Sequence, residues 1–133
     1  MQLLEHIHIN VDSILKTTEF LHIATPDLTE RGGGNDSDFG PWIHIGNDEL
    51  YIALTEVPGC SPPDGLRHIG IAVEDIEALM DRLSGAGFEP ADASELDSHP
   101  FRRRVYYVDG NGIDWEFVEY LSYDSEKRND YSL

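Results

Sequence analysis

The chain repeats itself once, and this internal repeat limits the possible folds more than any other feature of the sequence. Residues 6–14 and 68–76 both begin with His, carry Ile, Ile and Val at alternate positions, and end on Ile. Residues 42–56 align in the same way with residues 105–119. We therefore expect two homologous modules of about 60 residues.

The hydrophobic period changes in the same order within both modules. Residues 6–11 and 67–73 alternate between apolar and small or polar side chains, which is typical of half-buried strands. A helix should follow the first strand from about Ser13 until Pro26, with Asp12 or Ser13 as its N-cap. In the second module the apolar stripe of residues 75–83 predicts a helix that ends at Gly85 or Gly87.

The remaining segments complete the order strand, helix, strand, strand, strand in each module. Strands are predicted near residues 88–90, 102–108 and 113–120, and Asp109-Gly110-Asn111-Gly112 is a strong hairpin turn between the last two. The matching second strand of the first module falls in Glu30–Asp38, whose three glycines instead favour a mobile loop. These glycines do not form a phosphate-binding loop, because no Lys-Ser/Thr pair follows them. An α+β fold of two βαβββ modules is the expectation.

The domain organisation follows from the repeat. One domain, residues 1–121, should contain modules at about 1–57 and 66–121, joined by a linker at 58–65. The polar segment 122–133 has no period and is predicted to fray unless Tyr123 and Tyr131 dock on a partner.

Composition excludes several classes of function. The 133 residues include 26 acidic and 9 basic side chains, a formal net charge of −17, which disfavours nucleic acids and anionic membranes as partners. Apolar runs are too short to cross a membrane. The single cysteine, Cys60, allows no intramolecular disulfide, and we interpret it as a linker residue. A cytoplasmic protein is expected.

Three potential metal ligands are expected on the helix-free faces of the sheets. His6 and His68 occupy equivalent places in the repeat, and Glu116 alternates with the apolar Trp115 and Phe117. If the two half-sheets close on each other, these side chains meet, and two imidazoles with one carboxylate suit Fe(II), Mn(II), Zn(II) or Ni(II). A hydrogen-bonded or solvated histidine is the alternative at each strand position.

Most of the chain, from Leu3 to Tyr120, resembles the vicinal oxygen chelate superfamily, which includes glyoxalases, extradiol dioxygenases, fosfomycin-resistance thiol transferases and bleomycin-resistance proteins. The resemblance rests on residues 5–12, 67–75 and 108–117, that is, on two histidine strands and a hairpin followed by a glutamate strand. It implies paired βαβββ modules that form a cupped mixed β-sheet around a divalent metal ion.

The resemblance also implies which positions bind the metal. The family uses up to four ligand positions, of which His6, His68 and Glu116 match three, whereas the fourth falls on Ala53. A standard glyoxalase, with glutamates at both of the last positions, is therefore not expected. The remaining pattern is similar to that of extradiol dioxygenases and fosfomycin-resistance enzymes. The implied cofactor is a divalent Fe, Mn, Ni or Zn ion.

Two further side chains are candidate catalytic residues. His8 shares the face of His6 and could act as an acid–base catalyst, with a merely polar lining as the alternative. Tyr106 matches a substrate-contacting tyrosine of the fosfomycin-resistance group. His44 has no predicted role, because the repeat pairs it with Tyr107 rather than Tyr106.

Candidate substrate-binding residues are cationic or aromatic. Arg102 and Arg104 belong to the one local concentration of positive charge and could bind an anionic substrate, although edge-strand charges also discourage sheet pairing. Trp42, Tyr51 and Tyr106 could stack on a planar ligand.

Two functions are therefore predicted as alternatives. The first is a metal-dependent enzyme that chelates two oxygens of a small substrate, with dioxygenase-like or lyase or transferase chemistry. The second is a non-catalytic binding protein of the bleomycin-resistance type. For both, a homodimer is expected.

Overall fold

The computed structural model describes residues 2–91 and 96–133. Residue 1 and residues 92–95, which belong to the two predicted modules, lie outside the described part. The chain divides into two compact units: unit 1 contains Met1–Gly65 and Asp109–Gly112, and unit 2 contains Leu66–Val108 and Ile113–Leu133. The units follow the repeat, apart from the hairpin turn that unit 1 receives from the second half of the sequence.

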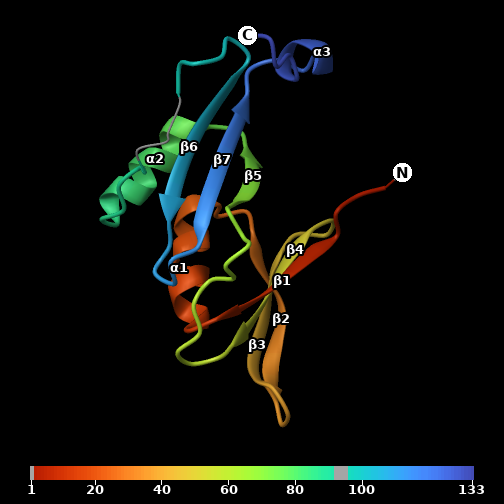
Figure 1. Cartoon of the computed structure of the whole chain (residues 1–133), viewed down its shortest axis with the longest axis vertical. Helices are drawn as coiled ribbons and strands as arrows, with labels where there is room; N and C mark the ends of the chain where they lie inside the picture. Colours follow the sequence, from red (N-terminus) through yellow and green to blue (C-terminus); the bar gives the residue numbers. More distant parts are fainter. Residues whose placement is uncertain (1, 92–95) are drawn as a thin grey trace. The chain divides into compact units, whose positions relative to one another are not determined.

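Unit 1 is a four-stranded mixed sheet with one helix (Figure 1). The strands lie in the order β1-β4-β3-β2; β1 is parallel to β4, and the other neighbours are antiparallel. The elements, in chain order, are β1 (His6–Val11), α1 (Ile14–Ala24), β2 (Thr29–Asp36), β3 (Gly40–Gly46) and β4 (Tyr51–Glu56).

Unit 2 is a three-stranded mixed sheet whose helix packs against β6 and β7 (Figure 1). The order is β5-β7-β6, with β5 parallel and β6 antiparallel to β7. Its elements are β5 (Ile69–Val73), α2 (Ile76–Gly85), β6 (Arg102–Val108), β7 (Asp114–Tyr120) and the short α3 (Ser125–Arg128).

The strand alternation predicted from the sequence sorts side chains as expected. In β1, Ile9 and Val11 are buried, whereas His6 and His8 are exposed. In β7, Trp115 and Phe117 are fully buried. Apolar residues therefore face the helix of each unit, and the opposite face of each sheet carries the polar side chains.

Both helices begin on the same type of interaction. The Ile14 backbone N–H donates to Glu56 Oε2 (2.9 Å), and the Ile76 N–H donates to Glu119 Oε2 (3.1 Å). Ser13 holds the N-cap position of α1, as predicted, but its side chain makes no capping hydrogen bond. A glutamate from the last strand of each unit therefore satisfies a helix N–H that would otherwise lack an acceptor.

The loop predicted at Glu30–Asp38 is wrong, because most of this segment belongs to β2. It pairs with β3 up to Asp36, whose carboxylate accepts N–H bonds from Asp38 and Phe39 and forms the turn. A Cβ added at Gly34 would lie 3.2 Å from Trp42 Nε1. Glycine is therefore needed there for the close approach of Trp42, and pairing with β3 outweighs its low strand propensity.

The strand predicted near residues 88–90 is also wrong. The Phe88 N–H donates to the Leu83 carbonyl (2.9 Å) and so closes the end of α2, after Gly87 at a φ of 88°. The following Ala91 N–H donates to the carbonyl of Tyr106 on β6 (2.7 Å). The Phe88 N–H is therefore engaged at the end of α2 and is not available for pairing with a strand.

The hairpin turn at Asp109–Gly112 is confirmed, and its side chains are anchored on α1. Asp109, only 5% exposed, accepts a 2.6 Å hydrogen bond from the Thr17 hydroxyl. Asn111 accepts from the Ser13 N–H and donates to the Ser13 carbonyl and Thr17 Oγ1. This polar network assigns the turn to unit 1.

The C-terminal segment, predicted to fray unless its tyrosines dock, contacts the rest of unit 2 at His99 and Arg102. The Arg102 guanidinium lies 4.8 Å from the centre of the Tyr131 ring, and His99 Nε2 is 2.8 Å from the Asp130 carbonyl oxygen. Tyr123 remains fully exposed.

Within the described ranges, no helix is long and apolar enough to cross a membrane.

Candidate functional site

In unit 2, a histidine and a glutamate meet on the polar face of the sheet. His68 Nε2 lies 2.9 Å from Glu116 Oε2. Residue 68 directly precedes β5, and Glu116 pairs with Gly70 on that strand, so the strand register places both side chains on one face. A Cβ added at Gly70 would lie 3.9 Å from Glu116 Oε2, an ordinary van der Waals contact, so Gly70 is a direct neighbour of the carboxylate on this face.

Two further predicted residues surround this pair. Tyr106 pairs with Glu116 across β6 and β7, and its ring contacts the His68 ring edge-on at a centroid distance of 5.5 Å. Arg104 Nη1 lies 3.9 Å from Glu116 Oε1. Unit 2 thus brings four of the predicted site residues together: His68, Glu116, Tyr106 and Arg104.

The donor atoms of this cluster suit a divalent metal ion. The Glu116 side chain is only 13% exposed and that of His68 is 34% exposed, so both are partly removed from water yet reachable. An imidazole nitrogen beside a carboxylate oxygen is a donor set for Fe(II), Mn(II) or Zn(II). Over the described ranges, however, no group of three His, Cys, Asp or Glu side chains is gathered as a metal site.

The other arginines of the predicted cluster have different surroundings. Arg103 faces the helix side, where it pairs with Glu77 (3.2 Å) and Glu119 (3.7 Å). Arg102, a predicted substrate contact, stacks on Tyr131 and has a buried Nε with no hydrogen-bond partner. The structure therefore brings only Arg104 of the three arginines beside Glu116.

Unit 1 presents an aromatic and histidine-rich face instead. The Tyr51 ring stacks with His6 (centroids 4.6 Å apart, 10° between planes) and with His44 (4.5 Å, 28°). His44 contacts Trp42 at 4.9 Å, and the Arg31 guanidinium carbon lies 4.5 Å from the centre of the Tyr51 ring. Tyr51 is therefore the centre of a stack that joins four strands.

Electrostatics on this face favour neutral rings and ionised carboxylates. Burial lowers the pKa of His44, and the nearby charges of Arg31, His8 and His6 lower it further. The hydrogen bond to His6 Nδ1 (2.6 Å) is the main reason that the pKa of Glu5 is lowered. Burial, followed by the Glu5 carboxylate, raises the pKa of the Tyr51 hydroxyl.

His8, the candidate acid–base residue, is oriented by a neighbour on β4. Its Nε2 lies 2.7 Å from Thr55 Oγ1. His8 pairs with Ala53, as Gly70 pairs with Glu116, so the register agrees with the equivalence of Ala53 and Glu116. Ala53 supplies no carboxylate at this position of unit 1.

The register also resolves the position of His44. It pairs with Ala53, and Tyr106 pairs with Glu116, so His44 is the structural equivalent of Tyr106 rather than of Tyr107. An ungapped sequence alignment misses this because the turn between β6 and β7 is one residue longer than the turn between β3 and β4, so the offset changes within the aligned segment.

Arg31 is the residue of this face that the sequence analysis missed. Two residues of β2 oppose one of β3 between the pairs Glu30–Ile45 and Gly32–His44, so Arg31 is the extra residue of a β-bulge. Arg31 could have been identified only if this segment had been predicted as a strand. The three glycines that follow it favoured a loop instead.

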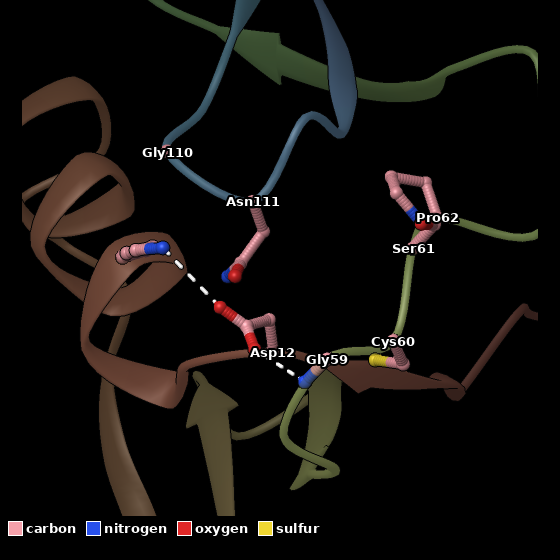
Figure 2. A pocket seen from close by; sticks show the side chains of 8 residues that line it. Asp12, Gly59, Cys60, Ser61, Pro62, Gly110 and Asn111 are labelled. Atoms are coloured by element: carbon pink, nitrogen blue, oxygen red, sulfur yellow. Dashed lines mark hydrogen bonds and ion pairs between the residues drawn. The ribbon is translucent and has the colours of Figure 1, made fainter.

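A second feature of unit 1 is an open hollow of about 320 Å³ near the start of α1 (Figure 2). Asp12 lines it, and its carboxylate accepts the Gly59 N–H (2.6 Å) and pairs with Lys16 Nζ (3.3 Å). These two contacts lower the pKa of the Asp12 carboxyl. Cys60, interpreted from the sequence as a linker residue, lines the same hollow as Lys16.

Comparisons with known proteins agree with the fold. The profile of the Glyoxalase/Bleomycin resistance protein/Dioxygenase superfamily matches residues 3–117. The chain belongs to this superfamily, as its resemblance in sequence predicted. Its order of strands and helices fits the paired βαβββ modules of that fold, and the described part of unit 2 forms three of the four strands of its module. A search of curated proteins found no match.

Several solved structures share this fold at low sequence identity. The fosfomycin resistance protein FosX from Listeria monocytogenes is 18% identical, with 98% of this chain and 99% of that chain covered and a TM-score of 0.72. A glyoxylase/bleomycin resistance protein/dioxygenase domain from a Frankia species is 22% identical over 90% and 98% of the chains, with a TM-score of 0.71. The antibiotic-binding protein TnmS3 from a Streptomyces species is 16% identical over 90% and 97%, with a TM-score of 0.64.

Proposed function

We propose that this protein is a metal-dependent enzyme that binds two oxygens of a small anionic substrate, with His6, His68 and Glu116 as the metal ligands. The observation that supports it is the 2.9 Å contact between His68 Nε2 and Glu116 Oε2 on the polar face of unit 2. FosX, one of the proteins with the same fold, has been crystallised with Mn(II) and a dihydroxypropylphosphonic acid.

The residues beside this pair have roles that do not depend on the identity of the ion. Arg104 lies next to Glu116 and offers a positive charge to an anionic group of the substrate. Tyr106 contacts the His68 ring and restricts its orientation. A bound divalent ion would polarise the two substrate oxygens and so favour lyase, transferase or dioxygenase chemistry.

His8 is proposed as the proton-transfer residue. Its hydrogen bond with Thr55 fixes the ring, and an imidazole nitrogen can accept or donate a proton in catalysis. His8→Gln should lower kcat with little change in metal affinity, because Gln retains a polar contact to Thr55 but cannot exchange a proton.

Metal binding by the purified protein tests the proposal directly. We expect about one equivalent of Mn(II) per chain by electron paramagnetic resonance, and at least about tenfold weaker binding for His6→Ala, His68→Ala and Glu116→Ala. The exposed His22 and Glu49 provide matched controls, His22→Ala and Glu49→Ala, that should bind as the wild type does. Less than about a tenth of an equivalent after addition of Fe, Mn, Ni or Zn would disprove it.

A second candidate function is binding of a planar ligand without chemistry. The stack of Trp42, His44 and Tyr51 favours it, because half-buried aromatic rings on one face of a sheet offer a stacking surface. One of the proteins with this fold is an antibiotic-binding protein. Binding of an aromatic compound that is independent of metal, and unchanged in Glu116→Ala, would favour this function over the enzyme.

The homodimer predicted from the family resemblance belongs to the same proposal. Light scattering coupled to size-exclusion chromatography should give a mass of about twice the 15.0 kDa chain, and a mass of one chain would contradict it.

A further inference from the structure

The two cations of unit 1 have different surroundings. Residues 1–65 contain 11 Asp and Glu side chains and only two basic ones, Lys16 and Arg31. Lys16 pairs with Asp12 at 3.3 Å. Arg31 instead lies on the Tyr51 ring, and no carboxylate in the described part of the chain forms an ion pair with it. The Glu5 carboxylate is near enough for the Arg31 charge to contribute to its lowered pKa, but the two form no ion pair among the described residues, so the guanidinium N–H groups can contact a ligand.

The backbone directs Arg31 onto the polar face. A β-bulge at this residue re-aims the side chain of an edge strand, so the guanidinium reaches Tyr51 on β4 across the width of β3. Stacking on an aromatic ring holds the plane of the guanidinium and leaves its N–H groups at the edge available. That geometry suits bidentate contact with an oxyanion.

The glycines that follow Arg31 keep the neighbouring surface open. Gly32 pairs with His44, and a Cβ added at Gly32 would meet nothing within 4 Å. The strand next to Arg31 therefore presents backbone rather than side chains, a common arrangement where a ligand approaches closely. The glycines do not have the pattern of a phosphate-binding loop. Gly32 instead leaves the surface next to Arg31 free of side chains.

Arg31 and the proposed metal ligand His6 both lie against the Tyr51 ring. His6, the proposed metal ligand of unit 1, stacks on Tyr51 at 4.6 Å, and Arg31 lies 4.5 Å from the centre of the same ring. Glu5 is engaged by His6 through its 2.6 Å hydrogen bond. A ligand on this face is therefore favoured when it carries negative charge.

We propose that Arg31, held by Tyr51 and flanked by His44 and the open Gly32 backbone, binds the oxyanion group of the substrate: a phosphonate, phosphate or carboxylate. This inference deepens the proposed function and rests on it for the role of the ligand as substrate. Arg31 is then a residue that determines specificity for anionic over neutral oxygenated molecules.

Titration with methylphosphonate, followed by the Nε–H resonance of Arg31 and by calorimetry, tests the proposal. We expect Arg31→Gln to weaken binding at least about tenfold, because a charge-assisted bidentate contact is lost. Arg31→Lys should give an intermediate loss, since it keeps the charge but not the fork. Propane-1,2-diol, a neutral molecule with two adjacent oxygens, should bind equally to the wild type and to Arg31→Gln.

Matched variants separate a binding role from a general charge effect. Arg82→Gln removes the same charge at an exposed position of α2 and should change methylphosphonate binding less than about twofold. Tyr51→Phe keeps the ring beneath Arg31 and should preserve binding, whereas Tyr51→Leu should weaken it. An equal loss in Arg82→Gln, or no binding by the wild type at about 10 mM, would overturn the proposal.

The same experiment distinguishes failure of this inference from failure of the proposed function. Mn(II) affinity should be unchanged within about twofold in Arg31→Gln, because the guanidinium is not a metal ligand. If Mn(II) does not bind while methylphosphonate binding still depends on Arg31, the metal proposal fails and the oxyanion site stands. If Arg31→Gln only lowers the unfolding midpoint and binds as the wild type, Arg31 serves packing alone and the inference is wrong.

Discussion

The polar faces of the two units have the same strand register but different side chains. Across three strands, the paired residues are His8, Ala53 and His44 in unit 1, and Gly70, Glu116 and Tyr106 in unit 2. Unit 2 therefore holds a carboxylate against an imidazole, whereas unit 1 holds a stack of rings with one arginine. A duplicated backbone can thus support two different surfaces, because side chains on the solvent face contribute little to the core.

The helix sides of the two units differ much less. Glu56 and Glu119 each accept the N–H of the first helical residue, and each helix buries large apolar side chains against its sheet. Both units must fill their core and must supply an acceptor for the first N–H groups of the helix. The side chains on the helix side are therefore similar in the two units.

The largest expected effects concern these shared cores. Phe20→Ala in unit 1 should lower the free energy of unfolding by about 3–5 kcal/mol and Leu79→Ala in unit 2 by about 2–5 kcal/mol, because both side chains are fully buried and leave cavities. Urea unfolding followed by circular dichroism measures both. Leu15→Ala, at a position 64% exposed, is the control and should change stability by less than about 0.5 kcal/mol. A loss of that small size in either core variant would contradict the assigned packing.

A smaller difference in stability is expected between alanine substitutions at the last residue of β3 and at the last residue of β6. Gly46 and Val108 are the last residues of these two strands. A Cβ at Gly46 would overlap the Leu50 carbonyl oxygen and lie 2.6 Å from Tyr51 Cα, so Gly46→Ala should cost about 1–3 kcal/mol. Val108→Ala, at a side chain that is 45% exposed, should cost well under about 1 kcal/mol. Equal unfolding midpoints for the two variants would show that β3 can move away from Tyr51.

Substitution of Glu56 and Glu119 tests whether the hydrogen bond from the first helical N–H to a glutamate stabilises both units equally. Glu56→Ala and Glu119→Ala should each reduce the free energy of unfolding by about 1 kcal/mol, because an N–H of the first helical turn loses its acceptor. Thermal unfolding measures the change, with Glu49→Ala in an exposed turn as the control. A cost in only one unit would mean that water replaces the carboxylate in the other.

The smallest expected effect is the pH response of His44. Its pKa is lowered in the folded protein, so the unfolded chain takes up its proton first as the pH falls. Stability is therefore lost as the pH falls from about 6.5, the ordinary histidine value, through the lowered pKa. Arg31→Gln should raise the pKa of His44, because it removes a neighbouring positive charge, and imidazole NMR titration would show this. An unchanged pKa would mean that burial and the neighbouring histidines lower it without Arg31.

Several features of the fold and site could be predicted from the sequence, for reasons that are local. Alternation in residues 6–11 placed Ile9 and Val11 inside and His6 and His8 outside, because strand side chains have a period of two. Turn residues predicted the hairpin at Asp109–Gly112, since Gly112 has a φ of 85°. The repeat itself predicted two modules, and the family resemblance agreed with it.

Other features depended on contacts between segments far apart in the sequence. The glycine-rich β2 exists because β3 pairs with it and Trp42 packs over Gly34, and neither interaction has a local signal. The bulge that directs Arg31 onto Tyr51 depends on the pairing of β2 with β3. The sequence by itself therefore determined the two modules and the candidate ligands, through local periodicity. Tertiary structure alone decided which of these side chains meet, because strand register and bulges are set by the pairing of distant residues.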